Sequence, residues 1–175
     1  MQIFGDRGTV AVTKKMKQLN DLEVMKPQGV KMLTQDQRNN ALPCLIFLTE
    51  KRDDSVKARM CVDGSKQEMD KSEVLAPTIS TDELFITLVV DAYEGRDVAT
   101  IHIPEAFLKT SVKPGNYIKF TGVMLYILCQ LNPSLYRQYV VLENGRKLLY
   151  TEAHKAVYVM VDSAFLFCLD LSGFL

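Results

Sequence analysis

The chain has 175 residues, of which 47% are hydrophobic, and its 21 basic and 21 acidic side chains cancel. This length and composition suit one domain with a substantial core and exclude a largely disordered chain. A net charge of zero excludes an overall positive field that would hold the protein on nucleic acid or on an anionic membrane, so such a surface would require local segregation of charge.

The cysteines and the apolar runs indicate the cellular setting. The cysteines are scattered, without a Cys-x-x-Cys pair or a nearby pair of histidines, which predicts reduced thiols and excludes a disulfide framework or a zinc site. The N-terminal stretch lacks the apolar segment of a signal peptide, and the apolar runs are too short for a membrane span or contain an aspartate. We expect a cytoplasmic or nuclear protein with no membrane contact and no disulfide partner.

The first third of the chain predicts two helices and a turn. Apolar residues at spacings of four and three predict an amphipathic helix within residues 9–25 that ends before Pro27. Its basic side chains are expected to form a solvated face: Lys14, Lys15 and Lys17. Thr34 and Gln37 form a capping box that opens a second helix, which Pro43 interrupts. The polar stretch "KRDDS" then predicts a turn.

The middle of the chain predicts a strand, a helix and a second strand. The alternation in "VKARMCV" places Lys57 and Arg59 side by side on one face of a strand. Residues 80–95 predict a helix with a capping box, an apolar stripe and a glycine at its end. A short buried strand is expected over residues 97–103 and carries His102 near its end. Pro104 then starts a helical turn that carries Phe107.

The last third predicts a strand at "YIKF", a buried helix at "GVMLYILCQL" and a hairpin at "YVVLENGRKLLY". The pair Asn144-Gly145 in this hairpin is a strong type I′ turn signal. Apolar residues from Lys155 onward predict a final helix. The order of elements is typical of an α/β or α+β protein.

Four stretches follow one another as in the reverse transcriptase of copia-type LTR retrotransposons, and the chain resembles that family over nearly its whole length. The stretches are "VKARMCVDGSKQ", "APTISTDELFITLVVDAYEGRDVATIHIPEAFL", "NPSLYRQYVVLENGRKLLY" and "HKAVYVMVDSAFLF". The resemblance implies an α+β fold, the fingers and truncated palm of a right-hand polymerase, with a mixed or antiparallel sheet packed with helices. It also implies a helical N-terminal segment over residues 1–52 and a truncated polymerase-like domain over residues 53–175.

The resemblance assigns nucleotide-binding roles to four side chains. The family's basic fingers strand, which holds the incoming triphosphate, corresponds to Lys57 and Arg59. An aromatic residue that screens the sugar 2′-position corresponds to Phe107, and the tyrosine of the family's Leu-Tyr-Gly sequence corresponds to Tyr158. A guanidinium suits phosphate as a bidentate fork and an ammonium as a point charge. Considered without the resemblance, Lys57 and Arg59 would be a solvated strand face.

His102 stands where the family has its first catalytic aspartate, a ligand of two magnesium ions. Two-metal phosphoryl transfer requires anionic oxygen ligands, whereas a neutral imidazole brings no charge and prefers other metals. Neither Asp97 nor Glu105 shares the site of His102, and the chain is expected to end before the family's Tyr-x-Asp-Asp hairpin. We therefore expect no polymerase activity and no cofactor in this chain, although the family uses Mg²⁺.

A further departure lies after Tyr158. Val159 replaces the family's glycine, and Asp162 stands where the family has glutamine. A glycine permits close backbone approach or positive φ, which a β-branched valine resists. Asp162 adds negative charge to a path for nucleotides.

We interpret the chain as a truncated, catalytically inactive remnant of an RNA-directed DNA polymerase that retains weak contact with template–primer and deoxynucleoside triphosphate. An alternative is a non-catalytic nucleic-acid- or nucleotide-binding module that uses the face of Lys57 and Arg59. A relic without specific binding is a third alternative, which would show self-association and no cooperative unfolding.

Overall fold

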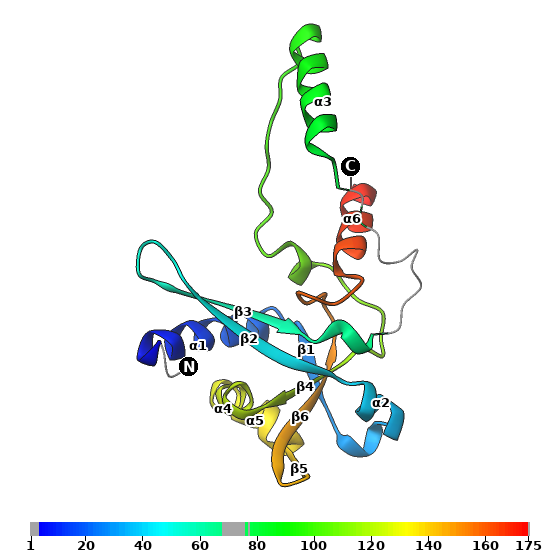
Figure 1. Cartoon of the computed structure of the whole chain (residues 1–175). Coiled ribbons are helices and arrows are strands. Elements are labelled where there is room, and N and C mark those ends of the chain that lie inside the picture. The colour runs from blue at the N-terminus through cyan, green and yellow to red at the C-terminus, as the bar shows by residue number, and fades with distance from the viewer. Residues whose placement is uncertain (1–3, 68–75, 77, 175) are drawn as a thin grey trace.

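The computed structural model describes residues 4–67, 76 and 78–174, which form a mixed sheet with helices packed against it (Figure 1). Six strands pair in the order β1-β6-β4-β2-β3, and β5 pairs with β6. All pairings are antiparallel except β2 with β4. The expected α+β class with a mixed sheet is confirmed at this level. The strands are β1 Met25–Gln28, β2 Leu42–Glu50, β3 Val56–Val62, β4 Tyr117–Thr121, β5 Val141–Glu143 and β6 Arg146–Ala153.

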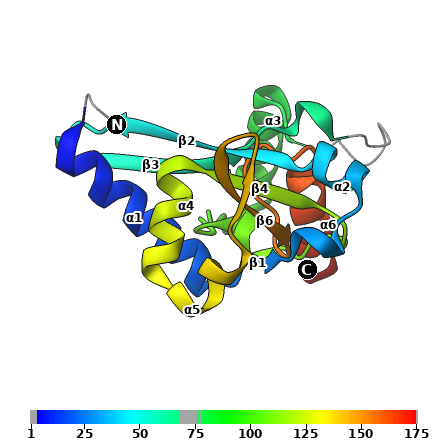
Figure 2. The ribbon, with the colours of Figure 1, turned by 90° about the horizontal axis from the view of Figure 1, so that it is seen from below.

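Helices α1 and α4 lie side by side and pack on the sheet (Figure 2). The α-helices are α1 Gly5–Asp21, α2 Gln35–Asn40, α3 Thr81–Glu94, α4 Gly122–Leu131, α5 Pro133–Tyr136 and α6 Ser163–Phe174. Short 3₁₀ helices are η1 Val30–Met32, η2 Gly64–Lys66, η4 Ala106–Lys109 and η5 Arg137–Tyr139. The predicted helices at residues 9–25 and 122–131 are thus confirmed, with shifted boundaries for the first.

The core joins α1 and α4 to the middle of the sheet. Met16 of α1, Met60 of β3, Phe120 of β4 and Leu128 of α4 are all completely buried in one cluster. Each side chain of this size contributes about 1.5–3 kcal/mol when it leaves water. The buried side chains of α1 therefore hold this helix against β3. The site described below lies between these two elements.

Two of the strands fall in the segment 1–52, which we expected to be helical. β1 pairs with β6 over Met25 to Gln28, and β2 pairs with β3 from Cys44 to Glu50. The capping box at Thr34 is present, but α2 ends at Asn40, and the chain passes into β2 through Leu42 and Pro43. Because Pro43 lacks an N–H and disfavours helix in the residue before it, the chain continues here as a strand.

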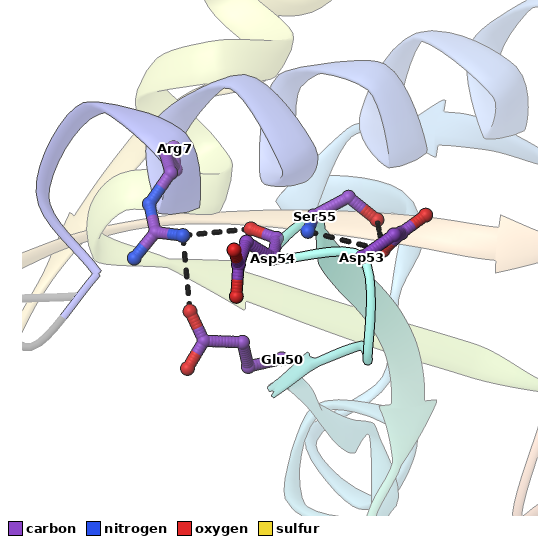
Figure 3. A network of polar contacts seen from close by, with 5 residues as sticks. All are labelled: Arg7, Glu50, Asp53, Asp54 and Ser55. Atoms are coloured by element: carbon purple, nitrogen blue, oxygen red, sulfur yellow. Dashed lines mark hydrogen bonds and ion pairs between the residues drawn. The ribbon is translucent and has the colours of Figure 1, made fainter.

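The turn between β2 and β3 is held by polar contacts that Figure 3 shows. The Asp53 carboxylate accepts hydrogen bonds from the Ser55 backbone N–H at 3.1 Å and from the Ser55 hydroxyl at 2.6 Å. Arg7 of α1 donates to the carbonyl of Asp54 at 2.7 Å and pairs with Glu50 at 3.0 Å. The adjacent aspartates therefore form a turn, as the sequence predicts.

Helix α3 extends away from the sheet (Figure 1). The predicted capping box of Ser80 and Glu83 is present, and Gly95 ends the helix with φ +65°. Its apolar side chains, however, contact little of the described structure, since Phe85 and Val89 are 61% and 69% exposed. The expected apolar stripe exists but is not covered by the described residues.

The helix expected from Lys155 onward begins only at Ser163. Backbone groups of the intervening residues bond to distant parts of the chain instead. The N–H groups of His154 and Lys155 donate to the carbonyl of Val24, and the carbonyl of Tyr158 accepts from the N–H of Val62. Backbone groups engaged in this way are not available for i to i−4 helical bonds.

The predicted hairpin of β5 and β6 is confirmed together with its turn. Asn144 and Gly145 have φ angles of +49° and +74°, as a type I′ turn requires. This turn places the first residues of β6 beside α4 and η5, where a second cavity forms.

Candidate functional site: a basic pocket between α1 and β3

A cavity of about 630 Å³ opens between α1, β3 and the segment around Tyr158. We call it the basic pocket, because five of its lining side chains are cationic and one is acidic. The cationic side chains are Lys14, Lys15, Lys51, Lys57 and Arg59, and the acidic one is Glu105.

β3 places two of these cations on one side of the sheet, as predicted. Lys57 and Arg59 are exposed, whereas Met60 and Val62 are buried in the core. Successive strand residues point to opposite faces, so Lys57 and Arg59 share the face opposite Met60 and Val62, and both line the pocket. Across the pocket, the adjacent residues Lys14 and Lys15 of α1 line the wall.

Lys15 corrects the expectation of a solvated lysine face on α1. Its side chain is 9% exposed, and its ammonium donates to Glu105 at 3.0 Å and to Gln18 at 2.9 Å. The Tyr158 hydroxyl donates to the same Glu105 carboxylate at 3.4 Å, and the Lys15 ammonium lies 5.6 Å from the centre of the Tyr158 ring. An ammonium over an aromatic ring gains further electrostatic stabilisation.

This network sets the ionisation of its members. Burial raises the pKa of Glu105, but hydrogen bonds and charge from Lys15, with hydrogen bonds from Gln18 and Tyr158, outweigh burial and hold that pKa below its ordinary value. Burial raises the pKa of Tyr158, and the Glu105 carboxylate raises it further. Glu105 is therefore a carboxylate at neutral pH, and Tyr158 keeps its hydroxyl proton.

The remaining cations of the pocket have no such counter-charge. Within the described part of the chain, the ion pairs at this pocket are confined to that of Lys15 with Glu105. The cations of the pocket that form no ion pair with a described residue are Lys14, Lys51, Lys57 and Arg59. Unpaired cations gathered around a cavity create a local positive potential in a chain whose net charge is zero.

Phe107 lies behind the pocket and not in its lining. Its ring packs edge-on against Tyr158, with centroids 5.4 Å apart, and against Phe167 of α6 at 6.1 Å. Such edge-to-face pairs orient aromatic rings. Of the four nucleotide-binding residues predicted from the resemblance, the structure thus brings Lys57, Arg59 and Tyr158 to one cavity, and Phe107 positions Tyr158.

His102 does not line this pocket, and the strand expected around it is absent. Residues 96–103 adopt no regular secondary structure, His102 is exposed, and Ile101 is 86% exposed. A strand requires a neighbouring strand for its backbone hydrogen bonds, and no described strand pairs with this segment. In the described part of the chain, no three side chains of His, Cys, Asp or Glu gather as metal ligands would.

The backbone beside Tyr158 is strained. Val159 has φ +72°, a region that a β-branched residue rarely adopts. A Cβ on Gly64 would lie 2.4 Å from the Val159 carbonyl oxygen, so the two backbones approach closely here. The family that the sequence resembles has a glycine at this position, which permits positive φ or a close approach of another backbone segment. The structure has both features, and the valine adopts the conformation.

Asp162 is buried beside the same turn and does not face the pocket. It accepts a hydrogen bond from the Gln67 amide at 3.4 Å, and the Gln67 amide oxygen accepts from the Val161 N–H at 3.0 Å. Its carboxylate therefore holds the chain that follows Val159 and adds no charge to the pocket lining.

The sequence interpretation missed the contributions of Lys14, Lys51 and Glu105 to the pocket. Lys14 and Gln18 are one helical turn apart, which indicates a common face of α1, but nothing local indicates which face of α1 meets β3. The partner of Lys15 lies 90 residues away. Only the fold brings that pair together.

No family model, no curated protein and no solved structure matches this chain. Among the described residues, no helix is both long and apolar enough to span a membrane, and all four cysteines are free. The basic pocket therefore carries the functional argument on its own geometry.

Proposed function

We propose that the chain is a non-catalytic nucleotide- or nucleic-acid-binding module that uses the basic pocket, and that it descends from a copia-type reverse transcriptase. The observation that carries the proposal is the set of unpaired cations, Lys14, Lys51, Lys57 and Arg59, around one cavity with an aromatic wall. Phosphate groups supply the matching charge, and a base supplies a flat surface for Tyr158.

The absence of catalysis is part of the proposal. His102 stands where the resemblance requires a carboxylate, and it is exposed and does not line the basic pocket. Template-directed polymerisation needs carboxylates that hold two divalent cations near the bound triphosphate. Among the described lining residues the pocket has one carboxylate, Glu105, and Lys15 already neutralises it.

A titration with labelled primer–template tests the proposal, with and without Mg²⁺ and deoxynucleoside triphosphates. We expect salt-dependent binding and no extension. Lys57→Gln and Arg59→Gln should each weaken binding and each reduce the slope of log K against log salt by about 1. Lys31→Gln, a change of an exposed cation outside the pocket, is the matched control and should change neither quantity.

The outcomes separate the alternatives. Primer extension that requires Mg²⁺ would show that the chain is an active polymerase and would contradict the proposal. Binding that Lys31→Gln weakens as much as Lys57→Gln would indicate a diffuse charge effect and reject the pocket. No binding at low salt, together with the absence of a cooperative unfolding transition, would leave the relic as the explanation.

A further inference from the structure

A second cavity, of about 740 Å³, lies between α4, η5 and the start of β6. It shares no lining residue with the basic pocket. Its size is within the range of sites that hold small organic ligands. We call it the α4 cavity.

The floor of the α4 cavity is apolar. Leu125 is 5% exposed and belongs to the main core, and the half-buried Cys129 and Val140 pack against that core. Tyr126, which is 63% exposed, adds an aromatic ring, and its hydroxyl accepts a hydrogen bond from the Gln130 amide at 3.0 Å. Leu125 and Cys129 are four residues apart on α4, as are Tyr126 and Gln130, so one stretch of helix supplies both pairs.

The rim of the α4 cavity is cationic. Arg137 of η5 and Arg146 and Lys147 of β6 line it, and none of its described lining residues is Asp or Glu. None of the three cations forms an ion pair with a described residue. Glu143 is opposite Arg146 in the hairpin, but its carboxylate accepts a hydrogen bond from the Tyr150 hydroxyl at 3.1 Å instead.

The charge of two of these cations is felt by a thiol in the floor of the cavity. Burial raises the pKa of the Cys129 thiol, and the positive charges of Arg137 and Lys147 oppose that rise. Their charge therefore reaches the apolar floor. A ligand seated on this floor would have its anionic group within reach of the guanidinium forks of Arg137 and Arg146.

We propose that the α4 cavity binds a small organic anion that joins an aromatic body to one anionic group, such as an aryl phosphate. The aromatic body would lie on Leu125, Cys129 and Tyr126, and the anionic oxygens would bond to the arginines. Both parts are required, because inorganic phosphate would leave the apolar floor in contact with water and a neutral aromatic molecule would leave the cations unpaired. This site is independent of the basic pocket and of its proposed function.

Calorimetric titration of the full chain with phenyl phosphate, inorganic phosphate and benzyl alcohol tests whether both the aromatic body and the anionic group are required. We expect phenyl phosphate to bind at least tenfold more tightly than either of the other two. Arg137→Gln and Arg146→Gln, both at exposed positions, should each weaken phenyl phosphate binding at least about fivefold. Lys31→Gln, a change of an exposed cation that lines neither cavity, is the matched control and should leave it unchanged.

A second readout uses the cysteines. Phenyl phosphate should slow alkylation of Cys129 in proportion to the occupied fraction, while the half-buried Cys168 of α6 should react at an unchanged rate. Peptide mass spectrometry separates the two rates. Equal rates for Cys129 with and without saturating ligand would overturn the proposal. Equal affinities for phenyl and inorganic phosphate would overturn it, as would binding lost in Lys57→Gln but kept in Arg137→Gln.

Discussion

The ammonium of Lys15 in α1 lies 3.0 Å from the carboxylate of Glu105, which is 90 positions later in the sequence. The lysine side chain is 9% exposed and the glutamate side chain 35% exposed. This contact joins the helix that lines one wall of the basic pocket to the segment that leads into η4. The other cations of the pocket form no ion pair with a described residue.

Lys15→Met should raise the pKa of Glu105, because burial then acts without the opposing hydrogen bond and charge. The free energy of unfolding at pH 7 should fall by up to about 1 kcal/mol, a small value because the carboxylate is partly exposed to solvent. Since the folded-state pKa of Glu105 lies below its ordinary value, the stabilisation is present above the unfolded pKa. It is lost as the pH falls through the folded pKa.

NMR titration of the Glu105 carboxyl and chemical unfolding at several pH values measure these effects. Lys14→Met is the matched control, because Lys14 is the exposed neighbour of Lys15 and forms no ion pair. An unchanged Glu105 pKa in Lys15→Met would show that the pair does not determine the ionisation of this carboxyl.

Val159→Gly should stabilise the protein. Val159 has φ +72° and is 60% exposed, so glycine removes backbone strain and gives up little apolar burial. An L-residue in this region costs about 1–2 kcal/mol, and glycine adds back part of that cost through the entropy of the unfolded chain. We expect a net gain of about 1 kcal/mol in thermal or denaturant unfolding. Val161→Gly is the control. Val161 does not have a positive φ, so this change should lower the free energy of unfolding.

Gly64→Ala should destabilise the same region from the other side. The added methyl carbon would lie 2.4 Å from the backbone oxygen of Val159, which cannot move aside as a flexible side chain could. Overpacking of this kind costs about 1–3 kcal/mol. Gly29→Ala is the control, because its nearest neighbour, Met32 Cγ, would be 3.7 Å away. Similar unfolding midpoints for the two variants would contradict the close approach of η2 to Val159.

Truncation of apolar side chains should affect the free energy of unfolding much less in α3 than in the core. Val89→Ala should change the free energy of unfolding by less than about 0.5 kcal/mol, because Val89 is 69% exposed. Leu128→Ala, in the completely buried part of α4, should cost about 2–5 kcal/mol. Denaturant unfolding of the two variants makes the comparison, and a large loss in Val89→Ala would mean that α3 is covered in solution.

His102→Asp should create neither a magnesium site nor polymerase activity. The new carboxylate would be on an exposed segment, and no cluster of potential metal ligands exists in the described structure to join it. Isothermal titration with Mg²⁺ should show no difference between the variant and the parent chain. A saturable, stoichiometric heat in the variant alone would reveal a site that we do not expect.

The local signals in the sequence predicted local structure well. Asn144-Gly145 predicted the type I′ turn, Ser80 with Glu83 predicted the start of α3, and the alternation around Lys57 and Arg59 predicted β3. Each of these signals depends on residues a few positions apart, whose backbone preferences determine the result.

The errors came from contacts between distant segments. The sequence predicts a short buried strand at 97–103, yet the segment has no strand beside it among the described residues. Apolar periodicity from Lys155 predicts a helix, but hydrogen bonds to Val24 and Val62 engage backbone groups of this segment, and the helix begins only at Ser163. The basic pocket itself combines α1, β3 and Tyr158, and no pattern within one segment shows that arrangement.

The pairing of β1 with β6 has a consequence for the order in which the protein can fold. Gln28 of β1 donates to Glu152 of β6 across 124 positions, and β1 pairs with no other strand in the described structure. During synthesis on the ribosome, β1 would emerge early and remain without its partner until β6 had also left the exit tunnel. Closure of so long a loop slows folding and prolongs exposure of the edge of β1. We therefore expect this half of the sheet to form after translation of β6 and to be the part of the nascent chain that most needs chaperone protection.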